Sequence, residues 1–152
     1  MGRRTTLVLA LVLLVLAAGC GDDDDGGEVD AGDDDSSAEE VAFDDLVGRT
    51  YLTTEATGHE VVAGSEINLT FIDGRISAVA GCNTQNGDAD VVDGTLEVNQ
   101  LASTMMGCED DLMAQDRWLA GFLESGPTVA LADGVLTLTS GEESLTLTEQ
   151  EV

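Results

Sequence analysis

The sequence predicts an α+β domain in which a strongly curved antiparallel β-sheet packs against one main helix. We expect about seven or eight strands in an open, barrel-like sheet. Three Asp-Gly pairs, each between two β-prone runs, support the hairpins of this sheet; they are Asp73-Gly74, Asp93-Gly94 and Asp133-Gly134. Asp-Gly favours type I′ turns, whose two central residues both adopt positive φ. One helical segment is too few for the crossovers of a parallel sheet.

The runs that flank these turns alternate apolar and polar residues, with threonine often on the polar side. This period of two buries one face of each strand and leaves the other face in water. In chain order, the expected strands are residues 48–53, 67–71, 76–80, 91–92, 95–98, 128–131, 135–139 and 144–148.

The expected helix covers residues 109–124, which contain a single glycine. At helical spacing, one face of this segment is formed by Leu112, Gln115, Leu119 and Phe122. Acidic residues at 109–111 complement the positive end of the helix dipole, and Gly126-Pro127 ends the helix. Trp118 lies beside the apolar face, where we expect it to pack against the sheet rather than bind a ligand.

The chain is strongly acidic. It has 31 acidic residues against five basic residues, all arginine, which gives a formal net charge of −26. Such a charge repels phosphate backbones and anionic lipid headgroups, so nucleic acid is excluded as a partner and electrostatic membrane binding is disfavoured. We expect a soluble, monomeric domain.

Residues 1–19 have the pattern of a bacterial lipoprotein signal peptide. Arg3 and Arg4 precede an uncharged apolar stretch that is shorter than the roughly 20 residues of a membrane span. Residues 16–20 resemble a lipobox, although Ala17 stands where leucine is usual. Lipidation of Cys20 with acyl chains such as palmitate predicts an exported protein anchored in the cell membrane or outer membrane, facing the extracytoplasmic side.

Residues 20–45 are expected to form a disordered acidic tether after the lipidated cysteine. Between positions 21 and 45 there are 13 acidic residues, separated mainly by glycine and serine. Too little of this segment can be buried to offset the entropy of ordering it, and charge repulsion extends it. The Asp runs lack the ligand spacing of a calcium loop. The folded domain is then expected over residues 46–152.

The sequence frames no catalytic site, cofactor site or metal site. His59, the only histidine, lies in an expected loop, and no nucleophile accompanies it in a recognisable motif. Asn86, Asp88, Asp90 and Glu97 copy part of a calcium loop, but a valine occupies the position that requires glycine. We therefore expect these four to be surface residues, and no enzymatic activity.

Several short motifs together resemble the META domain of HslJ-like heat-shock proteins and of many bacterial lipoproteins. The matching positions are Gly81, Cys82, Asn83, Thr104, Met106 and Cys108, followed by Gln115-Asp116 and Trp118-Leu119 in the helix. The opening residues 48–52 also fit, with Tyr51 where the family more often has tryptophan. The resemblance implies an antiparallel β-domain with one main helix and no established enzymatic activity. It also implies an association with heat shock, envelope integrity or drug resistance.

The cysteines give a second expectation for the same region. Lipidation of Cys20 leaves Cys82 and Cys108 as a pair in an oxidising compartment. A disulfide between them is favoured over two free thiols. A redox-active pair is the third alternative, although such pairs usually lie close together as Cys-x-x-Cys. The bridge would close a loop of about 27 residues and stabilise the fold by roughly 3.5 kcal/mol.

The sequence thus predicts an exported, lipid-anchored envelope protein. Its domain is expected to serve as a non-enzymatic binding or structural module in envelope stress tolerance. The expected partners are the membrane, through the N-terminal lipid, and an unidentified envelope protein or peptide. The alternative hypothesis is a surface lipoprotein that binds a cation or a small ligand, suggested by the acidic domain and the cluster around Asp88.

Overall fold

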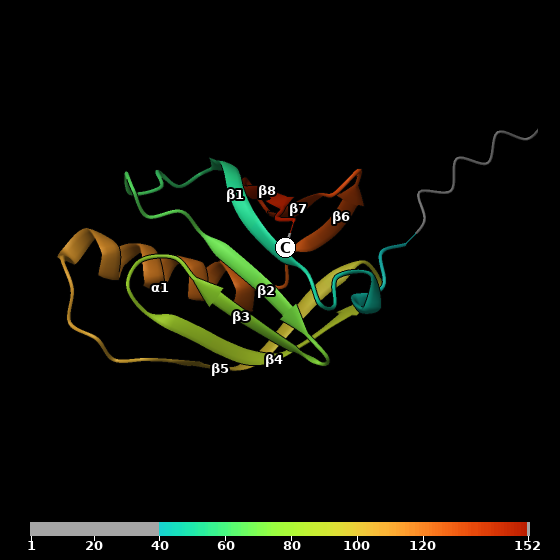
Figure 1. Cartoon of the computed structure of the whole chain (residues 1–152), viewed down its shortest axis with the longest axis horizontal. Helices are drawn as coiled ribbons and strands as arrows, with labels where there is room; N and C mark the ends of the chain where they lie inside the picture. Colours follow the sequence, from blue (N-terminus) through green and yellow to red (C-terminus); the bar gives the residue numbers. More distant parts are fainter. Residues whose placement is uncertain (1–39, 152) are drawn as a thin grey trace, which may run out of the picture. The chain divides into compact units, whose positions relative to one another are not determined.

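The computed structural model describes residues 40–151, so the expected signal peptide, the lipidated Cys20 and most of the acidic tether lie outside the described residues. A short 3₁₀ helix is followed by five strands, one α-helix and three more strands (Figure 1). The elements are η1 (Phe43–Asp45), β1 (Thr50–Thr57), β2 (Asn68–Ile72), β3 (Arg75–Val79), β4 (Thr84–Val92), β5 (Thr95–Ser103), α1 (Asp110–Glu124), β6 (Thr128–Ala132), β7 (Val135–Ser140) and β8 (Glu143–Glu149). Within residues 40–151, no helix has the length and apolar character needed to cross a membrane.

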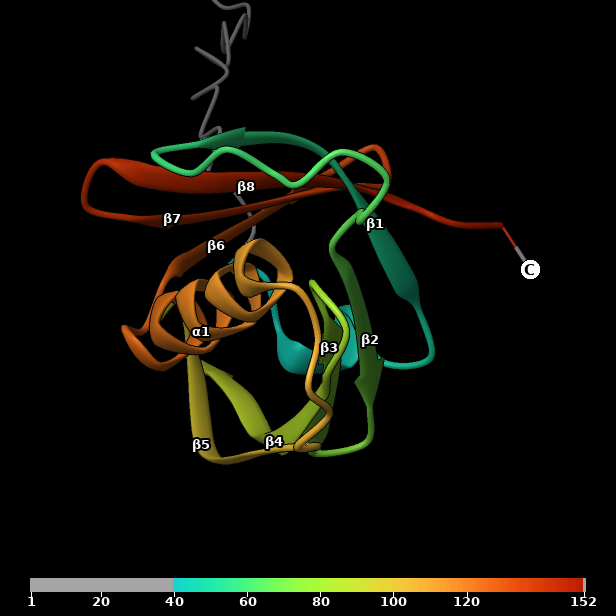
Figure 2. The ribbon, with the colours of Figure 1, turned by 90° about the vertical axis from the view of Figure 1, so that its left-hand side faces the viewer.

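The eight strands form a closed antiparallel barrel in which chain neighbours pair and β8 returns to β1. The closure is thinnest between β5 and β6, which are joined only at Thr95 and Thr128. Figure 2 shows α1 lying in the gap between these two strands. The expected α+β fold with a curved sheet and one helix is therefore confirmed. The sheet is closed rather than open, because one residue pair bridges the side that α1 covers.

The hairpin turns follow the expected dipeptides but not one common geometry. Asp93-Gly94 and Asp133-Gly134 have positive φ at both residues, as a type I′ turn requires. At Asp73-Gly74, only the glycine has positive φ, 67°. The expected type I′ geometry is therefore wrong for the first turn. The turn still connects β2 and β3 through two residues, because Ile72 pairs with Arg75.

Strand β4 is longer than expected because two of its buried positions, Gln85 and Gly87, carry no apolar side chain, and β5 is longer because a bulge interrupts its alternation. Their register shifts between Asn86 and Asp88. A Cβ atom at Gly87 would lie 2.8 Å from the carbonyl oxygen of Asn99, and Gln100 has a positive φ of 54°. The extra residue lies on β5 and interrupts the period of two in that strand, whereas β4 keeps its alternation throughout.

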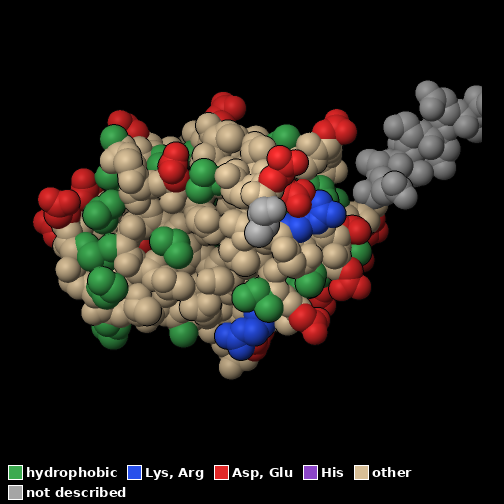
Figure 3. Space-filling view, viewed as in Figure 1, with side chains coloured by type: hydrophobic (Ala, Val, Ile, Leu, Met, Phe, Trp, Pro, Cys, Tyr) green, Lys and Arg blue, Asp and Glu red, His purple; other side chains and the backbone are tan. Residues whose placement is uncertain are grey.

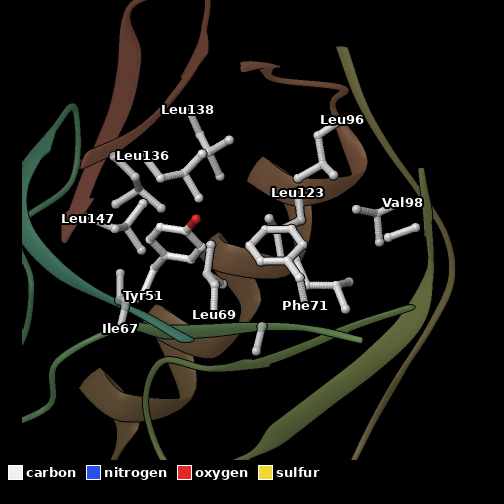
Figure 4. Close-up of a cluster of buried hydrophobic side chains, with 14 of the residues drawn as sticks. Tyr51, Ile67, Leu69, Phe71, Leu96, Val98, Leu123, Leu136, Leu138 and Leu147 are labelled. Carbon is white, nitrogen blue, oxygen red and sulfur yellow. The ribbon is translucent and has the colours of Figure 1, made fainter. Parts of the chain in front are cut away.

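The surface drawn in Figure 3 carries scattered acidic side chains, and its few basic side chains lie beside acidic ones. The main buried cluster is apolar. Buried residues from the inner faces of the strands meet Leu119, Phe122 and Leu123 of α1 in one cluster (Figure 4). The sheet alone does not enclose this cluster, and the helix supplies the wall on the side where β5 and β6 diverge.

The folded region begins before residue 46. Phe43, in η1, is only 8% exposed, and its ring packs edge-on against Phe71 at 5.9 Å between centroids. Leu46 is fully buried. The expected end of the tether at residue 45 is therefore wrong, because it lies a few residues too late. Acidic neighbours made the segment look unable to be buried, although Phe43 packs against the core.

Candidate functional site

The family-motif residues meet around the carboxylate of Asp116, on α1. Asp116 is 5% exposed. Its Oδ1 accepts a hydrogen bond from the amide of Gly81 at 2.7 Å, and its Oδ2 accepts from the amides of Cys82 (3.3 Å) and Asn83 (3.1 Å). The side-chain Nδ2 of Asn83 donates a fourth bond at 2.9 Å. Four N–H donors thus compensate the buried charge.

Gly81 permits this arrangement because the backbone after β3 runs directly against α1. A Cβ atom at this position would lie 2.2 Å from the carbonyl oxygen of Leu112 and 2.9 Å from Oδ1 of Asp116. Real Cβ atoms do not approach a backbone oxygen so closely, so any larger residue requires the backbone to move. The glycine is needed here for close approach rather than for its φ angle.

Asn83 links the helix to the loop of residues 104–109. Its Oδ1 accepts hydrogen bonds from the Thr104 hydroxyl at 2.9 Å and from the Met106 amide at 2.8 Å. The Thr104 hydroxyl also accepts a bond from the amide of Thr84. Because Asn83 is buried and uses both ends of its amide group, it fixes the loop and α1 relative to each other.

Cys82 and Cys108 form a disulfide that ties the same two segments. Their Cα atoms are 6.5 Å apart, and 26 positions separate them in the sequence. Both cysteines are half-buried. The structure thus has the disulfide that the sequence favoured, in place of two free thiols.

Gln115 is a second polar anchor on the buried face of α1. Its Nε2 donates to the carbonyl oxygens of Ala80 at 2.5 Å and Ser65 at 3.0 Å, and its Oε1 accepts from the amide of Val62 at 2.6 Å. The sequence pattern placed Gln115 among apolar positions without giving it a role. A polar residue at a core position of an amphipathic helix was the available signal, since buried amides require partners.

A small, mostly apolar cavity of about 230 Å³ adjoins this network. Met113, Arg117 and Ala120 line it from α1, and Met105 lines it from the loop. Met105 is 98% exposed and Met106 is 59% exposed, which is unusual for large apolar side chains. Sequence reasoning missed this cavity, because its walls come from segments that only the fold brings together.

Gln85, on β4, forms part of the cavity wall next to the helix. Its Nε2 donates to the main-chain oxygen of Asp116 at 2.6 Å. Its Oε1 is buried and has no hydrogen-bond partner among residues 40–151. The wall therefore contains one acceptor that the described protein atoms leave unused.

A larger hollow of about 580 Å³ lies beside β1 and contains His59. The imidazole stacks on the Trp118 indole with 4.0 Å between ring centroids, and Trp118 Nε1 donates to Glu143 at 2.8 Å. Trp118 thus packs against the sheet through β8, as expected. The hollow is wide and rimmed by Glu55, Glu60 and Glu66. The His59 ring lies against an indole rather than beside a nucleophile, so the larger hollow is a weaker candidate than the cavity near Asp116.

The acidic residues of the partial calcium loop lie on two paired strands. Asp90 faces Glu97 across β4 and β5, whereas Asp88 contacts Gln100 at 2.9 Å and Arg75 at 3.6 Å. In the part of the chain that the structure describes, no three His, Cys, Asp or Glu side chains are placed to hold a metal ion.

The Asp116 network is suited to holding structure rather than to acid–base chemistry. General acid–base catalysis needs a carboxylate that can reach a substrate proton. All four hydrogen bonds to the Asp116 carboxylate instead come from the protein itself. The accessible part of this region is the adjoining cavity and the exposed methionines of the loop.

Comparisons with known proteins agree with this geometry. The family model of the META domain matches residues 44–152. The search of curated proteins found no match. A protein solved by NMR is 25% identical with a TM-score of 0.60; the match covers 71% of this chain and 94% of that chain. An NMR structure of a protein from Burkholderia xenovorans is 18% identical with a TM-score of 0.62; it covers 72% of this chain and 87% of the other, and shows the fold alone.

Proposed function

Because the chain belongs to the META domain family, we propose that it is an exported, lipid-anchored protein with a non-enzymatic binding and structural role in envelope stress tolerance. The family consists of proteins associated with the envelope and with stress. Lipidation at Cys20 places the domain on the extracytoplasmic side of a membrane, at the end of the acidic tether. The partner of the domain is an envelope protein, a peptide or a small envelope component.

One observation carries the non-enzymatic part of this proposal. The polar groups of the family motif are bonded to each other, with the Asp116 carboxylate held by four N–H donors from residues 81–83. Reactive groups in enzymes are instead left accessible to a substrate. The motif supports a rigid wall between α1 and the loop, and the exposed Met105 and Met106 next to it favour a contact surface.

The anchor is tested by the fate of Cys20. The full chain is produced in a bacterial host with a labelled palmitate precursor, beside a Cys20→Ser variant. We expect label and membrane association for the wild-type chain and neither for Cys20→Ser. A wild-type chain without label, or a variant that remains equally labelled, contradicts the lipid anchor. Cys82→Ser serves as the matched control, because this cysteine lies in the folded domain and its loss leaves the lipidation site intact.

The role in stress tolerance is tested by deletion and complementation in the native host. We expect the deletion to lower heat tolerance, envelope integrity or resistance to drugs, and the wild-type chain to restore it. We expect the Cys20→Ser variant not to restore it, because the domain is then no longer anchored. A clean deletion with all three properties unchanged contradicts the proposal. Crosslinking of the anchored chain in cells then identifies its neighbours.

A small-ligand-binding lipoprotein is the second candidate function, and the cavity of about 230 Å³ favours it. Its walls are mostly apolar, and its polar residues Asn83, Gln85 and Asp116 are bonded to one another, which holds this part of the wall in place and reduces the entropy lost on binding. The cation-binding form of this candidate has a direct test. Calcium binding is expected to release heat in calorimetry and to raise the melting temperature, and the absence of both contradicts it.

A further inference from the structure

Among the arginines of the domain, Arg117 stands apart. Arg49 is bonded to Glu149 at 2.7 Å, and Arg75 lies 3.6 Å from Asp88. Arg117 has no carboxylate within ion-pair distance in residues 40–151, although acidic residues far outnumber basic ones. In a chain with such an excess of carboxylates, a cation without one is the unusual feature.

The surroundings of Arg117 on α1 explain its isolation. The residues three and four positions away on the helix are uncharged; they are Met113, Ala114, Ala120 and Gly121. The adjacent Asp116 directs its carboxylate to the amides of residues 81–83. No neighbour on the helix is therefore placed to neutralise the guanidinium.

Arg117 also belongs to the wall of the small apolar cavity. Met113 and Ala120 line this cavity about one helical turn to either side of Arg117, and the exposed Met105 lines it from the loop. Pockets for drug-sized ligands commonly have volumes of about 300–1,000 Å³. A volume of about 230 Å³ therefore suits a smaller molecule with an apolar body.

We propose that this cavity binds a small apolar monocarboxylate, whose apolar body lies between Met105, Met113 and Ala120 and whose carboxylate contacts the guanidinium of Arg117. The inference deepens the binding role proposed above, on which it rests, by naming a ligand class. A guanidinium offers paired N–H donors that match the two oxygens of a carboxylate. The methionines adapt to apolar groups of different shape.

The acidity of the domain does not prevent such a contact. At physiological ionic strength, charges more than about 8 Å apart are largely screened at the surface. The nearest carboxylate in the cavity wall is that of Asp116, and four N–H donors already face its oxygens. Among the described residues that line the cavity, Arg117 is the one basic side chain, and its guanidinium is available to a carboxylate in the cavity.

The test uses octanoate as the probe and octanamide as its neutral counterpart. Each is titrated into the isotope-labelled full chain. The acidic residues of the chain are then all present and compete with the probe for Arg117. We expect amide signals of residues near Met113 and Ala120 to shift. We expect a Kd for octanoate of about 1 mM, as is reasonable for a ligand of this size, and an affinity for octanamide about threefold to fivefold lower.

Two pairs of variants locate the binding. Arg117→Gln is expected to weaken octanoate about threefold to fivefold and to leave octanamide unchanged, whereas Arg75→Gln, with the same change of charge, leaves both unchanged. Ala120→Leu fills the cavity and is expected to abolish binding of both probes. Ala114→Leu adds the same side chain at an exposed position of α1 and is expected to leave binding intact. Amide spectra without probe confirm that each variant is folded.

Three results with octanoate and octanamide overturn the proposal. The first is the absence of amide signal shifts with octanoate, and the second is an equal affinity for octanamide and octanoate. The third is an equal loss of octanoate affinity in Arg117→Gln and Arg75→Gln. A leucine-terminated tripeptide with a free carboxylate that binds tighter than octanoate assigns the cavity to a chain end and also overturns it. These failures differ from failure of the envelope role. A deletion phenotype without octanoate binding removes only the ligand class, whereas octanoate binding without a phenotype removes only the envelope role.

Discussion

The side-chain amide of Asn83 donates a 2.9 Å hydrogen bond to the buried carboxylate of Asp116, from 33 positions earlier in the chain. The same amide group accepts hydrogen bonds from Thr104 and Met106 through its oxygen. This single pair thus joins the turn between β3 and β4, the helix α1 and the loop before the helix. The stability of the domain and the shape of the adjoining cavity should both depend on it.

Replacement of Asp116 by asparagine should strongly destabilise the domain. The variant presents an N–H group to a site that already contains four N–H donors, and it removes the charge that strengthens their bonds. We expect a loss of about 3 kcal/mol in the free energy of unfolding, measured by urea denaturation. Asp111→Asn, at an exposed position in the first turn of α1, should change it by less than about 0.5 kcal/mol. Equal midpoints for the two variants would contradict the structural role of Asp116.

Replacement of Gly81 by alanine should destabilise the domain through a backbone clash. The new Cβ atom would lie 2.2 Å from the carbonyl oxygen of Leu112, so β3 and α1 must separate. We expect a loss of about 2–3 kcal/mol, because overpacking at rigid contacts has costs of this size. Gly107→Ala is the matched control, since no atom lies within 4 Å of a Cβ at that position. Thermal unfolding of both variants measures the difference in stability. A Gly81→Ala domain that is as stable as the control would contradict the prediction.

Removal of the hydroxyl of Tyr51 should stabilise the domain. Tyr51 is fully buried, and its hydroxyl has no hydrogen-bond partner among the described residues. Figure 4 shows this hydroxyl within the apolar cluster. Tyr51→Phe is expected to raise the free energy of unfolding by about 1 kcal/mol, because it relieves the desolvation of the hydroxyl without leaving an unpaired partner. A lower unfolding midpoint for Tyr51→Phe would mean that the hydroxyl has a partner, such as a buried water.

The same residue should make the domain sensitive to alkaline pH. Burial raises the pKa of Tyr51 above its ordinary value of about 10. The folded state therefore holds the phenolic proton more tightly than the unfolded state does. The associated stability is complete below about pH 10 and is lost as the pH rises through the pKa of the folded state. Denaturation midpoints across this range should fall more steeply for the wild-type domain than for Tyr51→Phe, and parallel curves would contradict the assignment.

Loss of the disulfide should destabilise the domain without abolishing the fold. The bridge from Cys82 to Cys108 closes a loop between β3 and α1, and the chain-entropy model gives it roughly 3.5 kcal/mol. The hydrogen bonds of Asn83 still join the same segments after the bridge is removed. A Cys82→Ala, Cys108→Ala double variant should therefore unfold at lower urea with unchanged amide dispersion. The same urea midpoint as the wild-type domain would show that the bridge adds no stability.

The sequence was sufficient to predict the features that depend on local interactions. Two of the Asp-Gly turns have the expected positive φ at both residues, and the flanking strands pair across them in the predicted order. The helix was predicted within one residue of its start, because the acidic first turn and Gly126-Pro127 limit it at both ends. The pairing of Cys82 with Cys108 was favoured because no other pair remained in the domain.

Only the tertiary structure decided how these elements meet. The bulge at Gly87, the core position of Phe43 and the closure of the barrel at Thr95 and Thr128 depend on contacts between distant segments. The same holds for the environment of Asp116, whose partners at residues 81–83 come from a different element. A sequence pattern reports the periodicity of one segment and the preferences of its turns. It does not report which backbone approaches a carboxylate from 33 positions away, and that approach determines both the buried network and the cavity beside Arg117.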